Sequence, residues 1–198
     1  MIFLTIKSIK ESRLTLALLS VNVILFFIFG TLNYSEIFYS MILINENVVN
    51  QLEIWRLFTS MFIHADLSHL LSNMFGLLLF GSYVEQVFNK FHYVLIYFIS
   101  GLIGNVFTLL LFPLNTISYG ASGALFGLIG ASFITIAYEK DRILLVIALM
   151  YLLYFIMSSF APNINLWAHL FGLLTGLIIS YIIKKTETHL KSREIQLT

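Results

Sequence analysis

Residues 91–138 form a run of 48 consecutive positions that contains no Asp, Glu, Lys or Arg. This run is longer than one membrane-spanning helix, which needs roughly 20 mainly apolar residues, and a turn-forming cluster at 113–116 divides it in two. The rest of the chain is also poor in charge, because 11% of its 198 residues are charged, against about 25% in an average globular domain. Too few polar side chains are present to cover a water-soluble surface. We therefore expect an all-α integral membrane protein of one domain.

Apolar segments long enough to cross a membrane occur at six places. They are residues 14–32, 67–85, 91–112, 118–138, 143–161 and 166–183. When the N-terminus is placed in the cytoplasm, ten of the eleven Lys and Arg residues fall on the cytoplasmic side and only Arg56 falls outside. This asymmetry predicts six membrane-spanning helices with both termini in the cytoplasm. The chain then divides into an N-terminal segment at 1–13, a membrane domain at 14–183 and a C-terminal tail at 184–198.

The connection at 33–66 differs from the other loops because it is long and rich in apolar side chains. It is too apolar for a free loop and too often interrupted by polar residues to span the membrane. We expect it to lie half-embedded in the outer interface of the membrane, with Trp55 and Arg56 at the level of the lipid headgroups.

Strongly polar side chains inside a membrane are costly and usually functional, and here they gather at one depth. His69 and Asn73 lie in the second segment, Ser122 in the fourth and His169 in the sixth. These three segments all run inward from the outer face, and each of the four residues lies within about two helical turns of the outer end. His69 and Asn73 are four residues apart, which places them on one helix face. We therefore expect a common site just below the outer surface.

Glycines recur at helical spacing in the fourth and sixth segments. They are Gly120, Gly123, Gly127 and Gly130 in the fourth segment and Gly172 and Gly176 in the sixth. Small residues allow membrane helices to approach closely, so we expect these two faces to meet. His169 lies three residues before Gly172 and shares its face, which would bring the imidazole near Ser122.

A serine and a histidine at one depth indicate nucleophilic catalysis. A serine hydroxyl becomes a good nucleophile when a base removes its proton, and histidine suits that role near neutral pH. The acidic residues lie away from this level, so we expect a Ser122–His169 dyad without a carboxylate. Candidate donors to the developing oxyanion are the side chains of His69 and Asn73 and the backbone N–H of Ser122. Glu85, at the inner end of the second segment, is expected to bond a neighbouring helix end, which is a structural role.

Other functions remain open at this point. The chain has no cysteine, which excludes disulfides and thiolate metal sites, and it lacks the HExxH pattern of zinc proteases. A metal held by His64, His69 and His169 would have no carboxylate or thiolate ligand, and His64 and His69, five residues apart, do not share a helix face well. A non-enzymatic alternative is a small transporter or a helix-binding scaffold, in which the glycines serve packing and the histidines relay protons. The net charge of +1 gives no indication of a nucleic-acid partner.

Four motifs, read together, resemble those of the rhomboid family of intramembrane serine proteases. They are WRLFTSMFIHADLSHLLSNM at 55–74, Gly81 with Glu85, GASGALFG at 120–127 and AHLFGLLTG at 168–176. The resemblance implies a six-helix bundle in the bacterial inner membrane, with Ser122 as nucleophile and His169 as general base. It also implies transmembrane-protein substrates cleaved near the outer face, in contact with lipid and without metal or other cofactor. The positions to which it assigns supporting roles are His64, Trp55, Arg56, Glu85, Gly120, Gly123, Phe126, Gly172 and Gly176.

Three positions depart from the family pattern. Asn89 stands where many members have glycine, Phe126 stands where some have a tyrosine stacked on the histidine, and Phe171 is bulkier than the residue often found there. A phenylalanine can still stack on an imidazole, although it offers no hydroxyl. None of these changes removes a catalytic group, so we expect an active enzyme.

Overall fold

The computed structural model describes residues 6–31, 35–139, 142–160 and 164–197, which are mainly helical. The first helices are α1 (Ile6–Glu11), α2 (Arg13–Thr31), α3 (Ser35–Met41), α4 (Asn45–Gln51), α5 (Arg56–Thr59) and the 3-10 helix η1 (Ser60–Phe62). They are followed by α6 (Leu67–Gly76), the π-helical η2 (Leu77–Gly81) and α7 (Ser82–Val87). The remaining helices are α8 (Lys90–Leu111), α9 (Ser122–Glu139), α10 (Arg142–Ser159) and α11 (Leu166–Leu197). Two short strands, β1 (Leu43–Ile44) and β2 (Ile117–Ser118), pair antiparallel, with Leu43 opposite Ser118.

Three stretches of helix in the described residues are long and apolar enough to cross a membrane. They are Leu67–Val87, which joins α6, η2 and α7, then Lys90–Leu111 and Leu166–Leu190. Shorter apolar helices cover Arg13–Phe29 and Ser122–Tyr138. The chain is therefore a multi-pass membrane protein, while the count of six spans and the half-embedded connection stay predictions. The predicted boundaries at 32, 140–141 and 161–163 lie outside the described residues.

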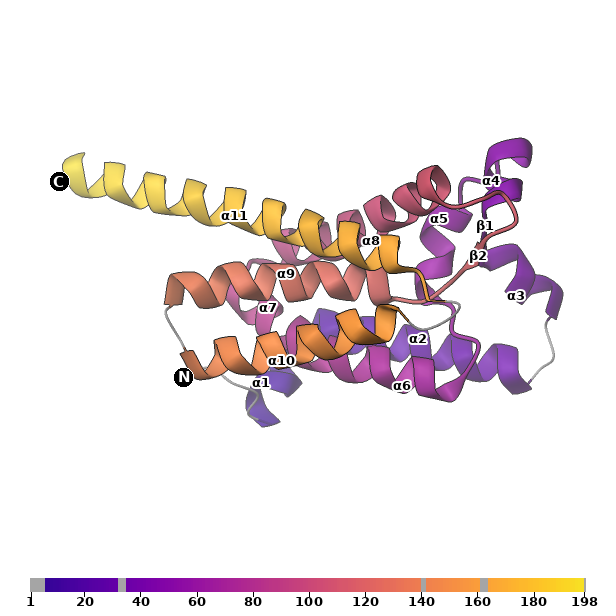
Figure 1. Cartoon of the computed structure of the whole chain (residues 1–198). Helices are drawn as coiled ribbons and strands as arrows, with labels where there is room; N and C mark the ends of the chain where they lie inside the picture. Colours follow the sequence, from indigo (N-terminus) through magenta and orange to yellow (C-terminus); the bar gives the residue numbers. More distant parts are fainter. Residues whose placement is uncertain (1–5, 32–34, 140–141, 161–163, 198) are drawn as a thin grey trace.

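The two ends of the helical bundle differ in what they carry (Figure 1). α3, α4, α5 and the two strands gather at the end where α9 and α11 begin (Figure 1). α1 lies at the opposite end, where the C-terminal part of α11 projects beyond its neighbours (Figure 1). α11 continues as one helix through the predicted tail as far as Leu197, so that segment begins without a break in the helix.

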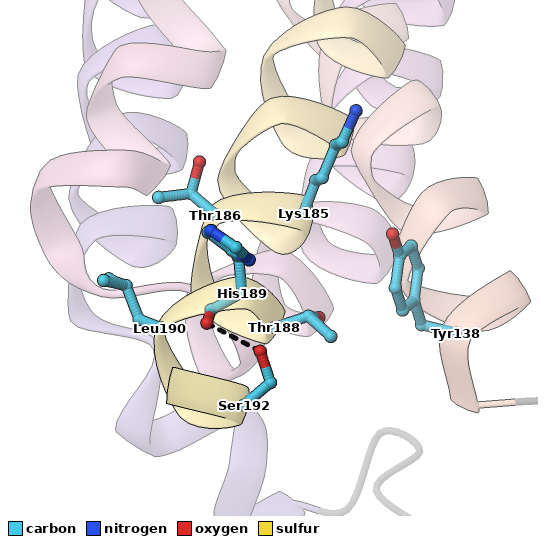
Figure 2. A pocket seen from close by; sticks show the side chains of 7 residues that line it. All are labelled: Tyr138, Lys185, Thr186, Thr188, His189, Leu190 and Ser192. Atoms are coloured by element: carbon cyan, nitrogen blue, oxygen red, sulfur yellow. Dashed lines mark hydrogen bonds between the residues drawn. The ribbon is translucent and has the colours of Figure 1, made fainter. Parts of the chain in front are cut away.

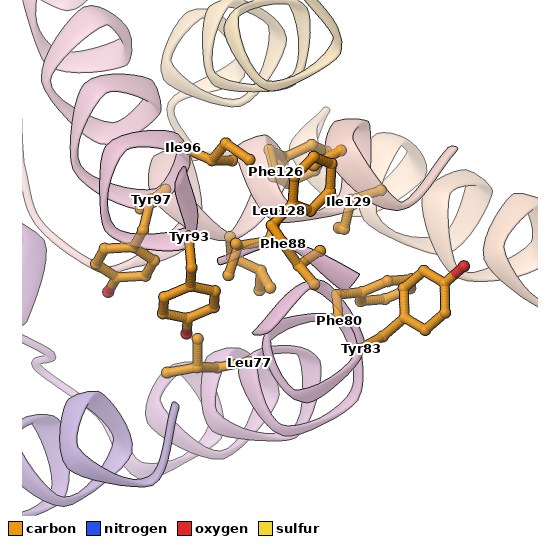
Figure 3. Packing of buried hydrophobic residues seen from close by; sticks show 14 of the residues in the cluster. Leu77, Phe80, Tyr83, Phe88, Tyr93, Ile96, Tyr97, Phe126, Leu128 and Ile129 are labelled. Carbon is orange, nitrogen blue, oxygen red and sulfur yellow. The ribbon is translucent and has the colours of Figure 1, made fainter. Parts of the chain in front are cut away.

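A core of large apolar and aromatic side chains fills the space between the helix at 67–87, α8 and α9 (Figure 3). Its labelled members are Leu77, Phe80, Tyr83, Phe88, Tyr93, Ile96, Tyr97, Phe126, Leu128 and Ile129, all of them buried. By contrast, α10 leaves Met150, Leu153 and Met157 largely exposed. Large exposed apolar surfaces are the expected lipid-facing surfaces of a membrane protein.

Polar side chains cap the helix ends inside this bundle. The Glu85 carboxylate accepts hydrogen bonds from the backbone N–H groups of Leu14, at 2.9 Å, and Thr15, at 2.8 Å, and from the Thr15 hydroxyl. These N–H groups belong to the first turn of α2 and have no partner within the helix, so the predicted structural role of Glu85 is confirmed. The Asn89 side chain accepts a hydrogen bond from the backbone N–H of His92 at 2.8 Å. Asn89, which stands where many family members have glycine, is therefore the N-cap of α8.

The connection between α2 and α6 is organised around a buried arginine. Arg56 is 4% exposed, and its guanidinium donates to the carbonyls of Tyr39 and Ile42 and to the carboxylate of Glu53. Hydrogen bonds from Asn47 and Arg56 lower the pKa of Glu53 below its usual value. Carbonyl oxygens and a carboxylate thus satisfy the guanidinium inside the protein, and the depth of Arg56 in the membrane stays a prediction. Trp55 is half exposed and donates through Nε1 to the Ser40 carbonyl at 3.2 Å.

Candidate active site

Ser122 and His169 meet at the starts of two neighbouring helices. Ser122 is the first residue of α9, and His169 lies in the first turn of α11. The Nε2 atom of His169 is 2.8 Å from the Oγ atom of Ser122, which is within hydrogen-bonding distance. The imidazole is buried, with 7% of the residue exposed, whereas Ser122 is partly exposed. The two side chains predicted to be close are thus in direct contact.

Gly120 shapes the turn that leads into Ser122. Its φ angle is +120°, a value that residues with a side chain rarely adopt. A Cβ atom at this position would lie 2.7 Å from the His69 ring, and the Gly120 N–H donates to the Ser60 carbonyl at 2.9 Å. The prediction that Gly120 continues the glycine face of the helix is wrong, because α9 begins only at Ser122 and the turn before it requires a positive φ angle at Gly120.

The glycine faces of α9 and α11 meet as predicted. A Cβ atom on Gly172 would lie 2.1 Å from the Gly123 carbonyl oxygen, and one on Gly176 would lie 1.9 Å from that of Gly127. Since both obstacles are backbone atoms, no larger residue fits without moving a helix. This backbone contact holds α11 close enough to α9 for His169 to reach Ser122.

α8 contributes two further close contacts that the sequence interpretation did not include. A Cβ atom on Gly104 would lie 2.7 Å from the Ala168 carbonyl oxygen, and one on Gly101 would lie 2.2 Å from the Met61 side chain. Asn165 completes this arrangement: its Oδ1 accepts from the Ala168 N–H at 2.9 Å, and its Nδ2 donates to the hydroxyls of Thr108 and Ser118. The start of α11 is therefore tied to α8 and β2. The spacing of Gly101 and Gly104, three residues apart on α8, was the sequence signal that could have predicted these contacts.

Two side chains hold the His169 ring in place. The Phe126 ring is stacked on the imidazole, with ring centroids 4.4 Å apart and an angle of 11° between the planes, as expected for a phenylalanine at this position. Ser159, at the end of α10, has its Oγ atom 2.6 Å from His169 Nδ1. Ser159 was missed because only carboxylates were considered as partners for the histidine, and no sequence pattern marks it.

His69 lies beside the turn that leads into Ser122, and Asn73 follows it one turn later on α6. The His69 ring packs against Gly120, and the Asn73 Nδ2 donates to the His69 carbonyl at 2.9 Å within α6. Asn73 is 1% exposed, and one N–H of its amide remains after that bond, because an amide carries two donors. The asparagine is therefore buried one helical turn beyond His69, and its amide has a second N–H donor.

His64 and His69 are in contact, contrary to the expectation from their spacing. Their ring centroids are 4.9 Å apart, because His64 precedes the helix, which starts at Leu67 after the cap Asp66. The rule of shared helix faces therefore does not apply to His64. Burial, and to a smaller extent the neighbouring His69, lowers the pKa of His64 to about 3. A neutral His64 ring thus lies beneath the turn, with Nε2 at 3.5 Å from the Ala121 N–H.

Among the described residues, no group of three His, Cys, Asp or Glu side chains is arranged to hold a metal ion. Polar side chains do line a pocket in another part of the molecule. An open pocket is present between α11 and the end of α9 (Figure 2). Its lining residues are Tyr138, Lys185, Thr186, Thr188, His189, Leu190 and Ser192. His189 is 20 residues beyond His169 on the same helix, about 30 Å away, so this pocket is separate from the site at Ser122.

Comparison with known proteins identifies the family of this chain. The model of the Rhomboid domain matches residues 51–186, which is more than half of the chain. The chain belongs to the rhomboid family. Members of this family are generally intramembrane serine proteases that act on membrane-protein substrates.

Relatives of this rhomboid occur in bacteria and plants. The Bacillus subtilis (strain 168) protein named "Putative rhomboid protease YdcA" is 36% identical over 142 residues, which cover 68% of this chain and 70% of the relative. The Arabidopsis thaliana "RHOMBOID-like protein 6, mitochondrial" is 36% identical over 143 residues, which cover 70% of this chain and 46% of the relative. The Arabidopsis "Inactive RHOMBOID-like protein 8" is 35% identical over 129 residues, which cover 62% of this chain and 36% of the relative. The chain thus spans less than half of these two plant relatives, and one of them is named inactive, so the names of the relatives do not establish activity for this chain.

Proposed function

We propose that this rhomboid is an intramembrane serine endopeptidase that uses Ser122 and His169 to cleave membrane-protein substrates. The observation that carries the proposal is the 2.8 Å distance between Ser122 Oγ and His169 Nε2 at the starts of two helices held in backbone contact. A base within hydrogen-bonding reach is what a serine needs to become a nucleophile. The remaining alternatives, a transporter or a helix-binding scaffold, require no such pair.

The first half of the reaction forms an acyl-enzyme. Ser122 Oγ attacks the carbonyl carbon of the scissile peptide bond while its proton passes to His169 Nε2. The tetrahedral intermediate collapses, the C–N bond breaks, and His169 returns the proton to the leaving amine. The new N-terminus departs, and an ester links the substrate carbonyl to Ser122.

Water completes the reaction. A water molecule gives a proton to His169 and attacks the ester carbon, and the bond from that carbon to Ser122 Oγ then breaks. The proton on His169 returns to Ser122, and the product leaves with a new carboxyl terminus. The partly exposed position of Ser122 is consistent with access of water to the ester.

The developing oxyanion requires donors in a fixed place. We assign this role to the backbone N–H of Ser122 with the side chains of Asn73 and His69. The N–H groups of the first helical turn lack partners within the helix, and the helix dipole places positive potential at the start of α9. The uncommitted N–H of the Asn73 amide supplies a further donor.

We further propose that the substrate is a membrane-spanning helix that unwinds near the outer face, because helical hydrogen bonds shield its carbonyls from attack. In this arrangement six helices span the bacterial inner membrane, and the connection at 33–66 lies in its outer interface. The positive-inside asymmetry supports cytoplasmic termini, and the site then lies a short way below the outer surface. No cofactor takes part in the steps above.

The experiment is a reaction with a fluorophosphonate probe in detergent, combined with cleavage of a model membrane-protein substrate. The parent protein should be labelled at Ser122 and should cleave the substrate. The Ser122→Ala variant should lose both reactions. The His169→Ala variant should be labelled and cleave at least about a hundredfold more slowly. Full activity in either variant, or an unlabelled parent, would overturn the proposal in favour of a scaffold or transporter.

A further inference from the structure

The buried hydroxyl of Ser159 contacts the side of the His169 ring that faces away from Ser122. Ser159 is the last residue of α10 and is 3% exposed. Its Oγ atom lies 2.6 Å from His169 Nδ1, while Nε2 of the same ring lies 2.8 Å from Ser122 Oγ. Both ring nitrogens of His169 are thus occupied, one by each serine.

The proposed role of His169 as a base toward Ser122 decides which ring nitrogen carries the proton. A neutral imidazole has one N–H donor and one acceptor nitrogen, and a base toward Ser122 must keep Nε2 as the acceptor. The hydrogen then resides on Nδ1, and Ser159 Oγ accepts the hydrogen bond from this N–H group. A hydroxyl oxygen has lone pairs that can accept this bond, so Ser159 is a suitable partner for the Nδ1–H donor.

Other serines and threonines inside the bundle illustrate the usual use of a buried hydroxyl. Ser132, Thr135 and Ser180 donate to the carbonyl four residues earlier in their own helix. Ser159 also reaches a ring on another helix, at a short distance. The Phe126 stack fixes the plane of the same ring, so stacking and hydrogen bonding restrain His169 in complementary directions.

We propose that Ser159 is a positioning residue that holds His169 in the tautomer and rotation required of the general base, which makes the site a Ser122–His169–Ser159 arrangement. The inference rests on the proposed protease function. The hydroxyl is uncharged, so it orients the imidazole and keeps a partner on Nδ1 in both protonation states without adding a negative charge. Ser159 acts through His169 and does not touch the substrate in this proposal.

A pair of isosteric variants separates the hydroxyl from the shape of the side chain. Ser159→Thr keeps the hydroxyl and adds a methyl group, whereas Ser159→Val has the same shape as threonine but no hydroxyl. A buried N–H left without a partner costs about 1–3 kcal/mol, so Ser159→Val should react about 5- to 150-fold more slowly than Ser159→Thr. Ser159→Ala should resemble Ser159→Val. Ser180→Ala, which removes a hydroxyl bonded within α11, is the control and should stay within about twofold of the parent.

Two readouts on the full chain in detergent distinguish positioning from a packing defect. The rate of fluorophosphonate labelling at Ser122 reports on the nucleophile, and kcat and KM for a membrane substrate report on catalysis and binding. Loss of kcat and of labelling rate in Ser159→Val, with little change in KM and recovery in Ser159→Thr, supports the proposal. Equal rates in the valine and threonine variants, or a change confined to KM, overturn it.

The same experiment distinguishes this inference from the proposed function. A parent protein labelled at Ser122 with an unlabelled Ser122→Ala variant supports the protease, and a fully reactive Ser159→Val variant then removes only the role of Ser159. An unlabelled parent removes both. Equal loss in the valine, threonine and alanine variants shows that the hydroxyl does not set the rate and also overturns the positioning role.

Discussion

Replacing Gly176 with alanine tests whether the contact between α9 and α11 sets the geometry of the site. A Cβ atom at this position would lie 1.9 Å from the Gly127 carbonyl oxygen and 2.6 Å from the Gly127 Cα atom. Both are backbone atoms, so no side-chain rotation relieves the overlap and the two helices must move apart. The 1.9 Å separation falls about 1.5 Å short of the 3.4 Å at which ordinary contact begins.

The magnitude follows from the hydrogen bond that this contact supports. A shift of about 1 Å between the helices would lengthen the Ser122–His169 bond from 2.8 Å to about 3.8 Å, which is beyond hydrogen-bonding range. Overpacking of this kind costs about 1–3 kcal/mol of stability. We therefore expect Gly176→Ala to lower the free energy of unfolding by about that amount and to slow the labelling of Ser122 at least about tenfold.

The assay measures the rate of fluorophosphonate labelling at Ser122 and the thermal unfolding midpoint of the same purified protein. Ile178→Ala is the control for the rate, because Ile178 lies on the same helix and is 58% exposed. Gly123→Ala is the control for the midpoint, because a Cβ atom there meets nothing closer than 3.5 Å. A Gly176→Ala protein with the parental rate and midpoint would refute the conclusion that helix backbones in direct contact hold Ser122 and His169 together.

Three further predictions concern Phe126, Glu85 and His64. Phe126→Ala removes the stack on His169 and should slow labelling about two- to tenfold, since such stacking contributes about 0.5–1.5 kcal/mol; Phe126→Tyr should restore the rate, and equal rates in both variants would contradict the stacking role. Glu85→Ala leaves the first turn of α2 without its cap and should lower the free energy of unfolding by about 1–3 kcal/mol in a thermal or denaturant titration; an unchanged transition would show that the cap contributes no stability. The pKa of His64 is about 3 in the folded protein, below the ordinary value near 6.5, so the folded state binds fewer protons than the unfolded state between these values. The contribution of neutral His64 to stability is therefore complete above pH 6.5 and declines as the pH falls toward 3, by up to about 1.4 kcal/mol per pH unit. His64→Gln should flatten the fall of the unfolding midpoint with pH, and an unchanged slope would contradict the assignment.

Much of the fold could be predicted because a lipid environment restricts the chain to a few structures. The uncharged run at 91–138 predicted two buried or lipid-facing helices, and the turn cluster at 113–116 separates α8 from the segment that contains β2 and α9. The glycine spacing indicated which faces of α9 and α11 meet, and the position of His169 next to Gly172 indicated that its ring turns toward Ser122. Their contact was therefore foreseeable, while their roles as base and nucleophile stay proposals.

The connection before α6 shows where prediction from a one-dimensional pattern ended. Arg56 was expected, together with Trp55, to anchor this connection at the level of the headgroups, and the sequence did not show that carbonyl oxygens of the folded loop enclose its guanidinium. His64 was treated as part of a helix that begins only after Asp66, so its contact with His69 did not follow from spacing.

The amino-acid sequence by itself determined the membrane character of the chain, the approximate limits of its apolar helices and the faces on which small residues gather. These features depend on composition and on the helical repeat, both of which are local. Only the tertiary structure decided that Ser159 of α10 reaches His169, that Gly120 stands outside the helix, and that Arg56 is buried. A hydrogen bond between two helices depends on their relative depth and rotation, and these are set by the packing of all neighbouring helices at once.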